Sequence, residues 1–71
     1  MERLVEVTAG YGLDSNGYNW TERVITDESV LAVIEMRYNI QIALAIEYEE
    51  GNETKSVRIV TTDRKHYKLY L

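Results

Sequence analysis

The sequence contains no cysteine, no proline and no phenylalanine, and His66 is its single histidine. Without cysteine, no disulfide bond can form. A structural zinc ion needs about four thiolate, imidazole or carboxylate ligands. A chain with one histidine and no thiolate does not supply the usual set. The sequence therefore predicts a domain that has neither disulfides nor a metal centre. A chain without cysteine also fits a reducing, cytoplasmic compartment.

Long hydrophobic runs are missing as well. The longest apolar candidate, Ile40 to Ile46, is far shorter than the roughly 18 residues that a membrane-spanning helix needs. The first six residues include Glu2, Arg3 and Glu6, so we expect no secretory signal peptide. The sequence predicts a cytoplasmic protein that does not enter a membrane.

Positive charge is scarce. Eight Lys and Arg residues face twelve Asp and Glu residues, which gives a formal net charge of −4. Proteins that bind nucleic acid usually carry a basic surplus that neutralises phosphates, so direct nucleic-acid binding is not expected. A modest negative charge is ordinary for a small soluble domain. It also suits a basic protein partner, or imitation of nucleic acid toward a protein that binds it.

The chain of 71 residues forms one domain, residues 1–71. A domain of this size buries only about 60% of the surface that its unfolded chain exposes, so its core is marginal. Small domains often gain stability from disulfides, a metal or a partner subunit. Because the first two are not expected, a homo-oligomer or a complex with another protein is favoured. Folding as a monomer remains the alternative.

Glycine alone punctuates the chain, because proline is absent. Residues 3–8 alternate apolar and polar side chains, which indicates a half-buried strand. Asn16-Gly17 favours a tight hairpin turn, since both residues tolerate the positive φ of a type I′ turn. The sequence thus predicts that a returning strand over residues 18–26 pairs with the first strand.

A helix is expected next. Thr26 or Asp27 can cap its amino end, and the acidic residues that follow suit the helix dipole. The apolar residues from Val30 to Tyr38 fit helical spacing, although a strand alternation fits them too. Good helix formers such as Leu31, Ala32 and Glu35 favour the helix.

Three strands complete the expected fold. Residues 40–48 alternate most clearly, and their larger side chains are predicted to face the core: Ile40, Ile42, Leu44, Ile46 and Tyr48. A strand over 56–61 follows, with Val57, Ile59 and Thr61 directed inward, and Tyr67, Leu69 and Leu71 complete a terminal strand. The prediction is an α+β fold, an antiparallel β-sheet with one helix packed on one face, in the order β-β-α-β-β-β.

No set of catalytic side chains stands out. Nucleophilic catalysis needs a nucleophile beside a base, and each serine lies at a turn or helix start that explains it. His66 has no sequence neighbour that would orient it as a general base. Asp14 to Gly17 is similar to part of a calcium loop, but Arg23 stands where the bidentate glutamate is required. We therefore predict a protein that is not an enzyme and has no cofactor.

Three groups of residues are candidate interaction surfaces. Aromatic rings among small polar residues are typical of binding loops, although burial in the core is the competing interpretation for Trp20. These aromatic residues are Tyr11, Tyr18 and Trp20. A flat side of the central strand with small residues is a predicted dimer interface, formed by Gln41, Ala43 and Ala45. An acidic surface is predicted around the following turn, with Glu47, Glu49, Glu50 and Glu53.

A possible family likeness is confined to the second half of the chain. There a helix, Ile46-Glu47-Tyr48, an acidic glycine turn, Val57-Arg58-Ile59-Val60 and the segment Tyr67 to Leu71 follow one another. In this order they resemble a WYL module, an Sm-like barrel of bacterial regulators. The resemblance implies sensing of a nucleotide or nucleic-acid ligand. The Trp-Tyr-Leu signature and the proline expected after the arginine strand are missing, so no functional residue is transferred.

Taken together, these features favour a non-enzymatic protein-binding module. Small acidic proteins without a cofactor or catalytic set are typical of inhibitors and adaptors that viruses or mobile elements direct at host proteins. A WYL-like sensing module and an acidic mimic of nucleic acid are the alternatives.

Overall fold

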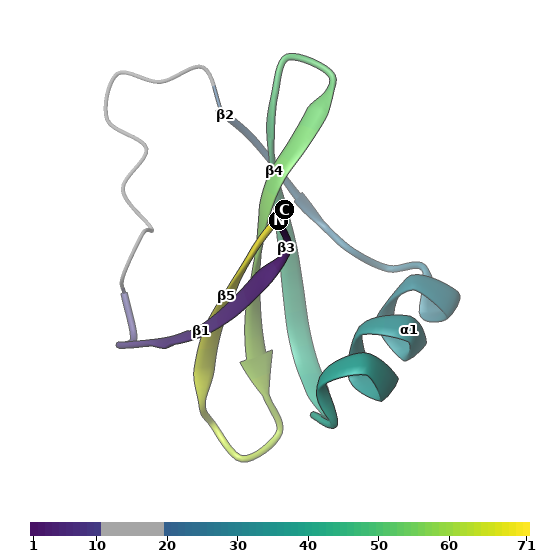
Figure 1. Cartoon of the computed structure of the whole chain (residues 1–71), viewed down its shortest axis with the longest axis vertical. Helices are drawn as coiled ribbons and strands as arrows, with labels where there is room; N and C mark the ends of the chain where they lie inside the picture. The colour runs from purple at the N-terminus through teal and green to yellow at the C-terminus, as the bar shows by residue number, and fades with distance from the viewer. Residues whose placement is uncertain (11–19) are drawn as a thin grey trace.

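The structure is a computed structural model that describes residues 1–10 and 20–71. The elements are β1 (Arg3–Val7), β2 (Trp20–Val24), α1 (Glu28–Tyr38), β3 (Ile42–Glu50), β4 (Glu53–Thr61) and β5 (His66–Tyr70). In this part of the chain the strands form one antiparallel sheet in the order β1-β5-β4-β3-β2, and α1 lies on one face of it (Figure 1). The predicted α+β fold and its element order are confirmed.

The predicted hairpin between the first two strands is wrong. β1 pairs with β5, and β2 pairs with β3, so the two strands form opposite edges of the sheet. In β1, Leu4 lies opposite the buried Leu69 and packs against the core. The partner of β1 is thus determined by burial of its apolar side chains against β5. A turn signal in the local sequence does not contain this information. The Asn16-Gly17 turn itself lies outside the described residues.

Local capping defines both ends of α1. Asp27 is the N-cap, and its carboxylate accepts a hydrogen bond of 2.9 Å from the backbone N–H of Ser29, as the sequence predicts. At the other end Asn39 adopts the left-handed conformation, with φ of 55°, which ends the helix. The helical interpretation of residues 28–38 is therefore confirmed.

The inward face predicted for β3 is only partly right. Ile42 packs on the core, but a register shift lies between Ile42 and Leu44, which interrupts the alternation. As a result Ala45 is buried, with 2% of its surface exposed, whereas Leu44 is 42% exposed. Tyr48 is buried too, but on the face of the sheet that points away from α1. The small side chain of Ala45 leaves room for α1 to approach the sheet.

A small core lies between the sheet and α1. Its buried members are Ala45, Val57, Ile59 and Leu69. Leu31, Ile34 and Tyr38 of the helix pack against them, yet α1 itself has no buried residue. The helix therefore covers one side of the core, while its own outer side stays exposed to solvent.

The two faces of the sheet differ in character. Residues directly opposite each other on paired strands point to the same face. Across the strands, the face away from α1, called here the opposite face, carries rows of paired residues. One row is Glu22, Tyr48, Ser56, Tyr70 and Arg3, and the next is Val24, Ile46, Arg58, Lys68 and Val5. This face is thus lined by tyrosines and cations, whereas the face toward α1 is aliphatic.

Truncation of Ile59 tests the position of the core. We expect Ile59→Ala to lower the free energy of unfolding by about 2–5 kcal/mol, because a fully buried side chain leaves a cavity. Leu44→Ala, which removes a similar side chain from a half-exposed position, should cost about 1 kcal/mol or less. Denaturant unfolding of both variants gives the comparison. Equal losses would contradict the observed facing of β3.

Candidate functional site

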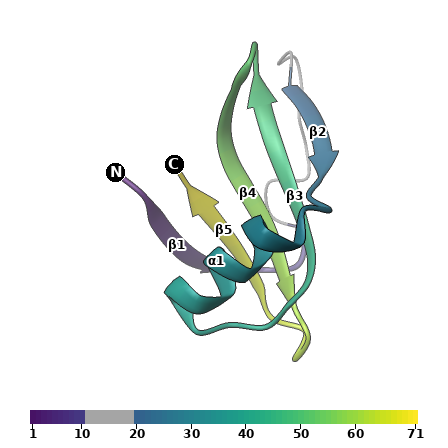
Figure 2. The same ribbon diagram turned by 90° about the vertical axis from the view of Figure 1, so that its right-hand side faces the viewer.

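Helix α1 is too small to cover its side of the sheet. β3 and β4 have nine residues each, which corresponds to about 30 Å of strand, and a helix with its side chains is about 10 Å across. In Figure 2 the helix crosses one half of the sheet, and β3 and β4 extend beyond it toward their connecting turn. Among residues 1–10 and 20–71, therefore, no second layer covers this part of the aliphatic face.

The uncovered part forms an open groove of about 360 Å³ between α1 and the sheet, which we call the helix–sheet groove. Apolar side chains make up most of its lining: Ile25, Val30, Val33, Ile34, Val57, Leu69 and Leu71. Its polar lining residues are Glu2, Arg37, Glu47 and Thr54. Val57 and Leu69 are buried core residues that form the floor, while Val30 and Val33 on the helix remain exposed.

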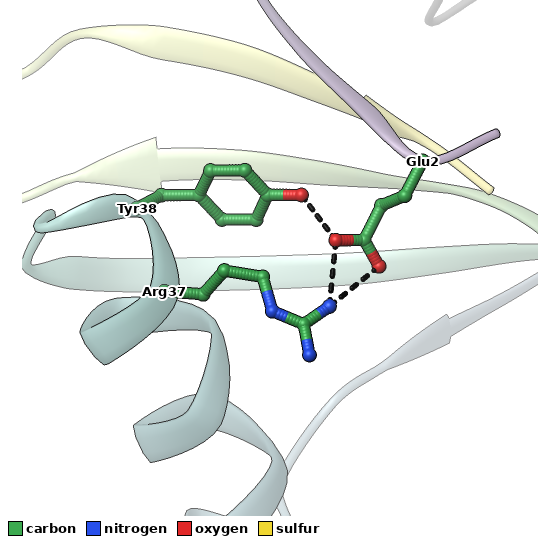
Figure 3. A network of polar contacts seen from close by, with 3 residues as sticks. All are labelled: Glu2, Arg37 and Tyr38. Carbon is green, nitrogen blue, oxygen red and sulfur yellow. Dashed lines mark hydrogen bonds and ion pairs between the residues drawn. The ribbon is translucent and has the colours of Figure 1, made fainter.

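A hydrogen-bonded clamp closes one end of the groove. Glu2, which precedes β1, meets Arg37 and Tyr38 at the end of α1 (Figure 3). Arg37 Nη1 donates to both carboxylate oxygens of Glu2, at 3.0 and 2.7 Å, and the Tyr38 hydroxyl donates to one of them. These contacts, first the Tyr38 hydroxyl and then Arg37, lower the pKa of the Glu2 carboxyl. The same contact with Glu2 raises the pKa of Tyr38. The sequence analysis missed this clamp, because no local pattern links residues so far apart.

Glu47 lines the groove from β3, and its acidic neighbour Glu49 lies outside the lining. Arg23 Nη1 lies 3.5 Å from a carboxylate oxygen of Glu49, and its Nε lies 4.0 Å from Glu47. The Thr54 hydroxyl donates to Glu47 at 3.5 Å. The predicted acidic surface therefore does gather around the β3–β4 hairpin, but its charge is partly balanced by Arg23.

Farther along the same hairpin, Lys55 Nζ lies 3.2 Å from Glu53. Three of the four predicted acidic residues, Glu47, Glu49 and Glu53, thus lie beside a cation. Glu50, the fourth, is exposed at the end of β3. Such pairing reduces the negative charge available to imitate a phosphate backbone.

The three residues of the predicted dimer interface do not lie on one open face of the sheet. Gln41 and Ala43 are exposed, but Ala45 is buried in the core on the side of α1. The register shift between Ile42 and Leu44 changes which side chains share a face, so the three residues do not share an open surface. The prediction of a homo-oligomer itself stays a prediction.

The predicted aromatic surface cannot be placed from the described residues. Tyr11 and Tyr18 lie outside them. Trp20 is the first residue of β2, opposite Glu50, and only its backbone is described.

The opposite face carries a ladder of cations and tyrosine rings. Lys68 Nζ lies 5.4 and 5.7 Å from the ring centres of Tyr48 and Tyr70, and the Arg3 guanidinium lies 5.2 Å from the Tyr70 ring. These distances suit cation–π attraction. Arg58, only 4% exposed, donates to the Thr8 carbonyl at 3.4 Å. Cross-strand pairing assembles this ladder, so it is not visible in any single strand of the sequence.

Two polar atoms beneath the opposite face are buried without a hydrogen-bond partner among the described residues. They are the Tyr48 hydroxyl and His66 Nδ1. Burial is the main cause that raises the pKa of Tyr48, and the nearby Glu22 carboxylate adds to it. A buried hydroxyl without a partner costs free energy, because it has given up its bonds to water.

No cluster of possible metal ligands emerges from the part of the chain that the structure describes. In residues 1–10 and 20–71, no three His, Cys, Asp or Glu side chains come together as possible metal ligands. Within the same residues, no helix is long and apolar enough to cross a membrane.

Comparisons of the chain with protein families, with curated proteins and with solved structures find no match. The function is therefore inferred from the geometry and charge of the described residues.

Acid titration tests the clamp between Glu2, Arg37 and Tyr38. Because the pKa of Glu2 is held below its ordinary value of 4.5, the folded state favours the ionised carboxylate. This stabilisation is complete above the ordinary pKa and is lost as the pH falls through the lower, folded-state value. We therefore expect the melting temperature of Glu2→Gln to fall less steeply than that of the wild type between about pH 5 and 2.

The control for this titration is Glu6→Gln, which neutralises an exposed glutamate of β1. Its melting temperature should follow the steeper dependence of the wild type. The same pH dependence for Glu2→Gln and the wild type would contradict the clamp.

Removal of the Tyr48 hydroxyl tests its lack of a partner. We expect Tyr48→Phe to raise the free energy of unfolding by about 1 kcal/mol, because a buried hydroxyl without a hydrogen bond is lost. The same substitution at Tyr38 should lower stability, because it breaks the bond to Glu2. Denaturant unfolding measures both changes, and a clear destabilisation by Tyr48→Phe would show that its hydroxyl is bonded.

Proposed function

We propose that this protein is a non-enzymatic protein-binding module, a small cytoplasmic inhibitor or adaptor that holds a segment of a partner protein in its helix–sheet groove. The observation that carries the proposal is the incomplete second layer of the fold. Helix α1 buries none of its own residues, and an apolar groove lies open beside it.

Burial of the groove by a partner would be favourable. Transfer of apolar surface out of water contributes about 25 cal/mol per Å², and contiguous exposed apolar surface often marks an interaction site. Val30, Val33 and Leu71 are large exposed apolar residues of the groove lining. A partner that covers them would supply the second layer that the chain lacks.

The polar groups of the groove support binding rather than catalysis. Glu2 is held by Arg37 and Tyr38, and Glu47 is held by Arg23 and Thr54. A general acid or base must instead be directed at a substrate. These side chains are positioned to stabilise the rim of the groove and to select the charge of what it binds.

A second candidate function is ligand sensing on the opposite face, as the resemblance to a WYL module implies. It is favoured by Arg3 and Lys68, whose cationic groups lie over tyrosine rings. Cations beside aromatic rings suit an anionic ligand that carries a planar base. Titration with nucleotides distinguishes this function, because a ligand on the opposite face would be insensitive to substitutions in the groove.

A pair of matched lysine substitutions tests the proposed function. Val33 in the groove and Val24 on edge strand β2 are 56% and 52% exposed. Lysine is a good helix former and is common on edge strands, so both variants should fold. We expect Val33→Lys to weaken capture of the partner protein by about tenfold or more, because it places a charge in an apolar contact. Val24→Lys should retain the partner.

Affinity capture from a host lysate, followed by titration of the purified partner, provides the measurement. Thermal melting of both variants confirms that they are folded. Equal binding of one partner by Val33→Lys and by the wild type would show that the groove is not its binding site.

A further inference from the structure

We propose that the occupant of the helix–sheet groove is an amphipathic α-helix with a basic edge, supplied by the partner protein. This inference rests on the proposed function and specifies the segment that the groove accepts. It follows from the shape of the groove, from the spacing of its apolar residues and from the charge of its rim.

The shape of the groove favours a helix. The groove lies over the face of the sheet, beside α1, and its floor is formed by Val57 and Leu69. A second helix could pack there next to α1 at the usual interaxial distance of about 8–10 Å, which would complete a two-layer fold. An extended peptide in the same place would leave its backbone N–H and C=O groups without partners over an apolar surface. A helix satisfies these groups internally.

The apolar residues of α1 have the spacing that a partner helix needs. Val30, Val33 and Ile34 line the groove, and they occupy positions i, i+3 and i+4 of the helix. Residues at this spacing form one stripe along a helix. A partner helix with a stripe of the same period can interdigitate with it, as amphipathic helices do in hydrophobic grooves.

The rim selects the charge of the occupant. The clamp pairs Glu2 with Arg37, while Glu47, on the β3 side of the groove, shares the single guanidinium of Arg23 with Glu49, and neither Arg23 nor Glu49 is part of the lining. The rim therefore carries a carboxylate surplus on its β3 side. Lysine or arginine along one edge of the bound helix would balance this charge, whereas an acidic helix would be repelled.

Charge also argues against a second copy of this chain as the occupant. If α1 of another copy lay in the groove, it would bring Glu28 toward a rim that already has a carboxylate surplus, while its Arg37 is already paired with Glu2. The whole chain carries a net charge of −4, which opposes self-association further. A basic partner helix meets no such repulsion.

Three designed peptides of about 16 residues, long enough to form helix in part, test the inference. The first has leucines in one helical stripe and lysines at the flanking positions. The second keeps the leucines but replaces each lysine by glutamate. The third has the composition of the first with its leucines scattered around the helix. Binding to the full chain is measured by fluorescence anisotropy of a label on each peptide, at low and at high salt.

We expect the first peptide to bind at least about tenfold more tightly than the other two, and to weaken as salt rises. Val33→Lys should reduce its affinity by about tenfold or more, and Val24→Lys should not. Glu47→Gln, which removes a rim charge, should weaken the first peptide severalfold. Glu22→Gln removes the same charge from the opposite face and should leave binding unchanged.

The outcomes separate this inference from the function on which it rests. If the acidic and basic peptides bind equally and both are lost in Val33→Lys, the groove binds proteins but the basic edge is wrong. If the scattered peptide binds as well as the first, the helical stripe is wrong. Concentration-dependent dimerisation of the chain that Val33→Lys abolishes would identify a second copy as the occupant. If peptide binding is insensitive to Val33→Lys, the groove itself fails as a binding site.

Discussion

Helix α1 packs on the core through Leu31 and Ile34, and polar contacts at its two ends fix its position on the sheet. At its amino end, the Ile25 N–H donates to the Ala45 carbonyl at 2.9 Å, which fixes the chain where it enters the helix. At its carboxyl end, the clamp to Glu2 and a bond of 2.8 Å from the Ile42 N–H to the Glu35 carboxylate hold the last turn. Because the helix is secured at its ends, its middle need not be enclosed.

This arrangement separates the molecule into two chemically different sides. The side of α1 is aliphatic with an acidic rim, whereas the opposite face gathers Arg3, Arg58 and Lys68 among tyrosine rings. The net charge of −4 does not reveal the division. An average over the whole chain describes its solubility, while recognition depends on how the charges are distributed between the two faces.

Local patterns predicted the elements and the inward face of β4, but not the partner of β1 or the facing of β3. The cap at Asp27, the helical spacing after it and the order of the strands are local properties, so the sequence alone was sufficient for them. The register shift after Ile42 arises from pairing with β4, and it exchanged the expected places of Leu44 and Ala45. An alternation of apolar and polar residues in the sequence does not show where strand pairing shifts by one residue.

The candidate site was hidden from the sequence for a related reason. Glu2, Val33 and Leu69 line one groove, yet they come from the start, the middle and the end of the chain. The residues that sequence reasoning singled out were chosen by type and local spacing, and among those that the structure describes, Glu47 alone is part of this lining. The groove exists because α1 covers only part of the sheet. The position of the helix on the sheet must therefore be known before the groove can be found.

The pairing of the first strand with the last has a consequence for the synthesis of the protein. β1 is synthesised before its neighbour β5, which places Leu69 opposite Leu4, and the other described elements lie between them in the chain. Before β5 is made, the floor of the groove lacks Leu69. β1 also has no strand to pair with, so Glu2 is not yet positioned to bind Arg37 of α1. A nascent chain therefore cannot present the groove to a partner before β5 has emerged. The topology thus determines when the protein can bind a partner, because the binding surface is complete only after β1 has paired with β5.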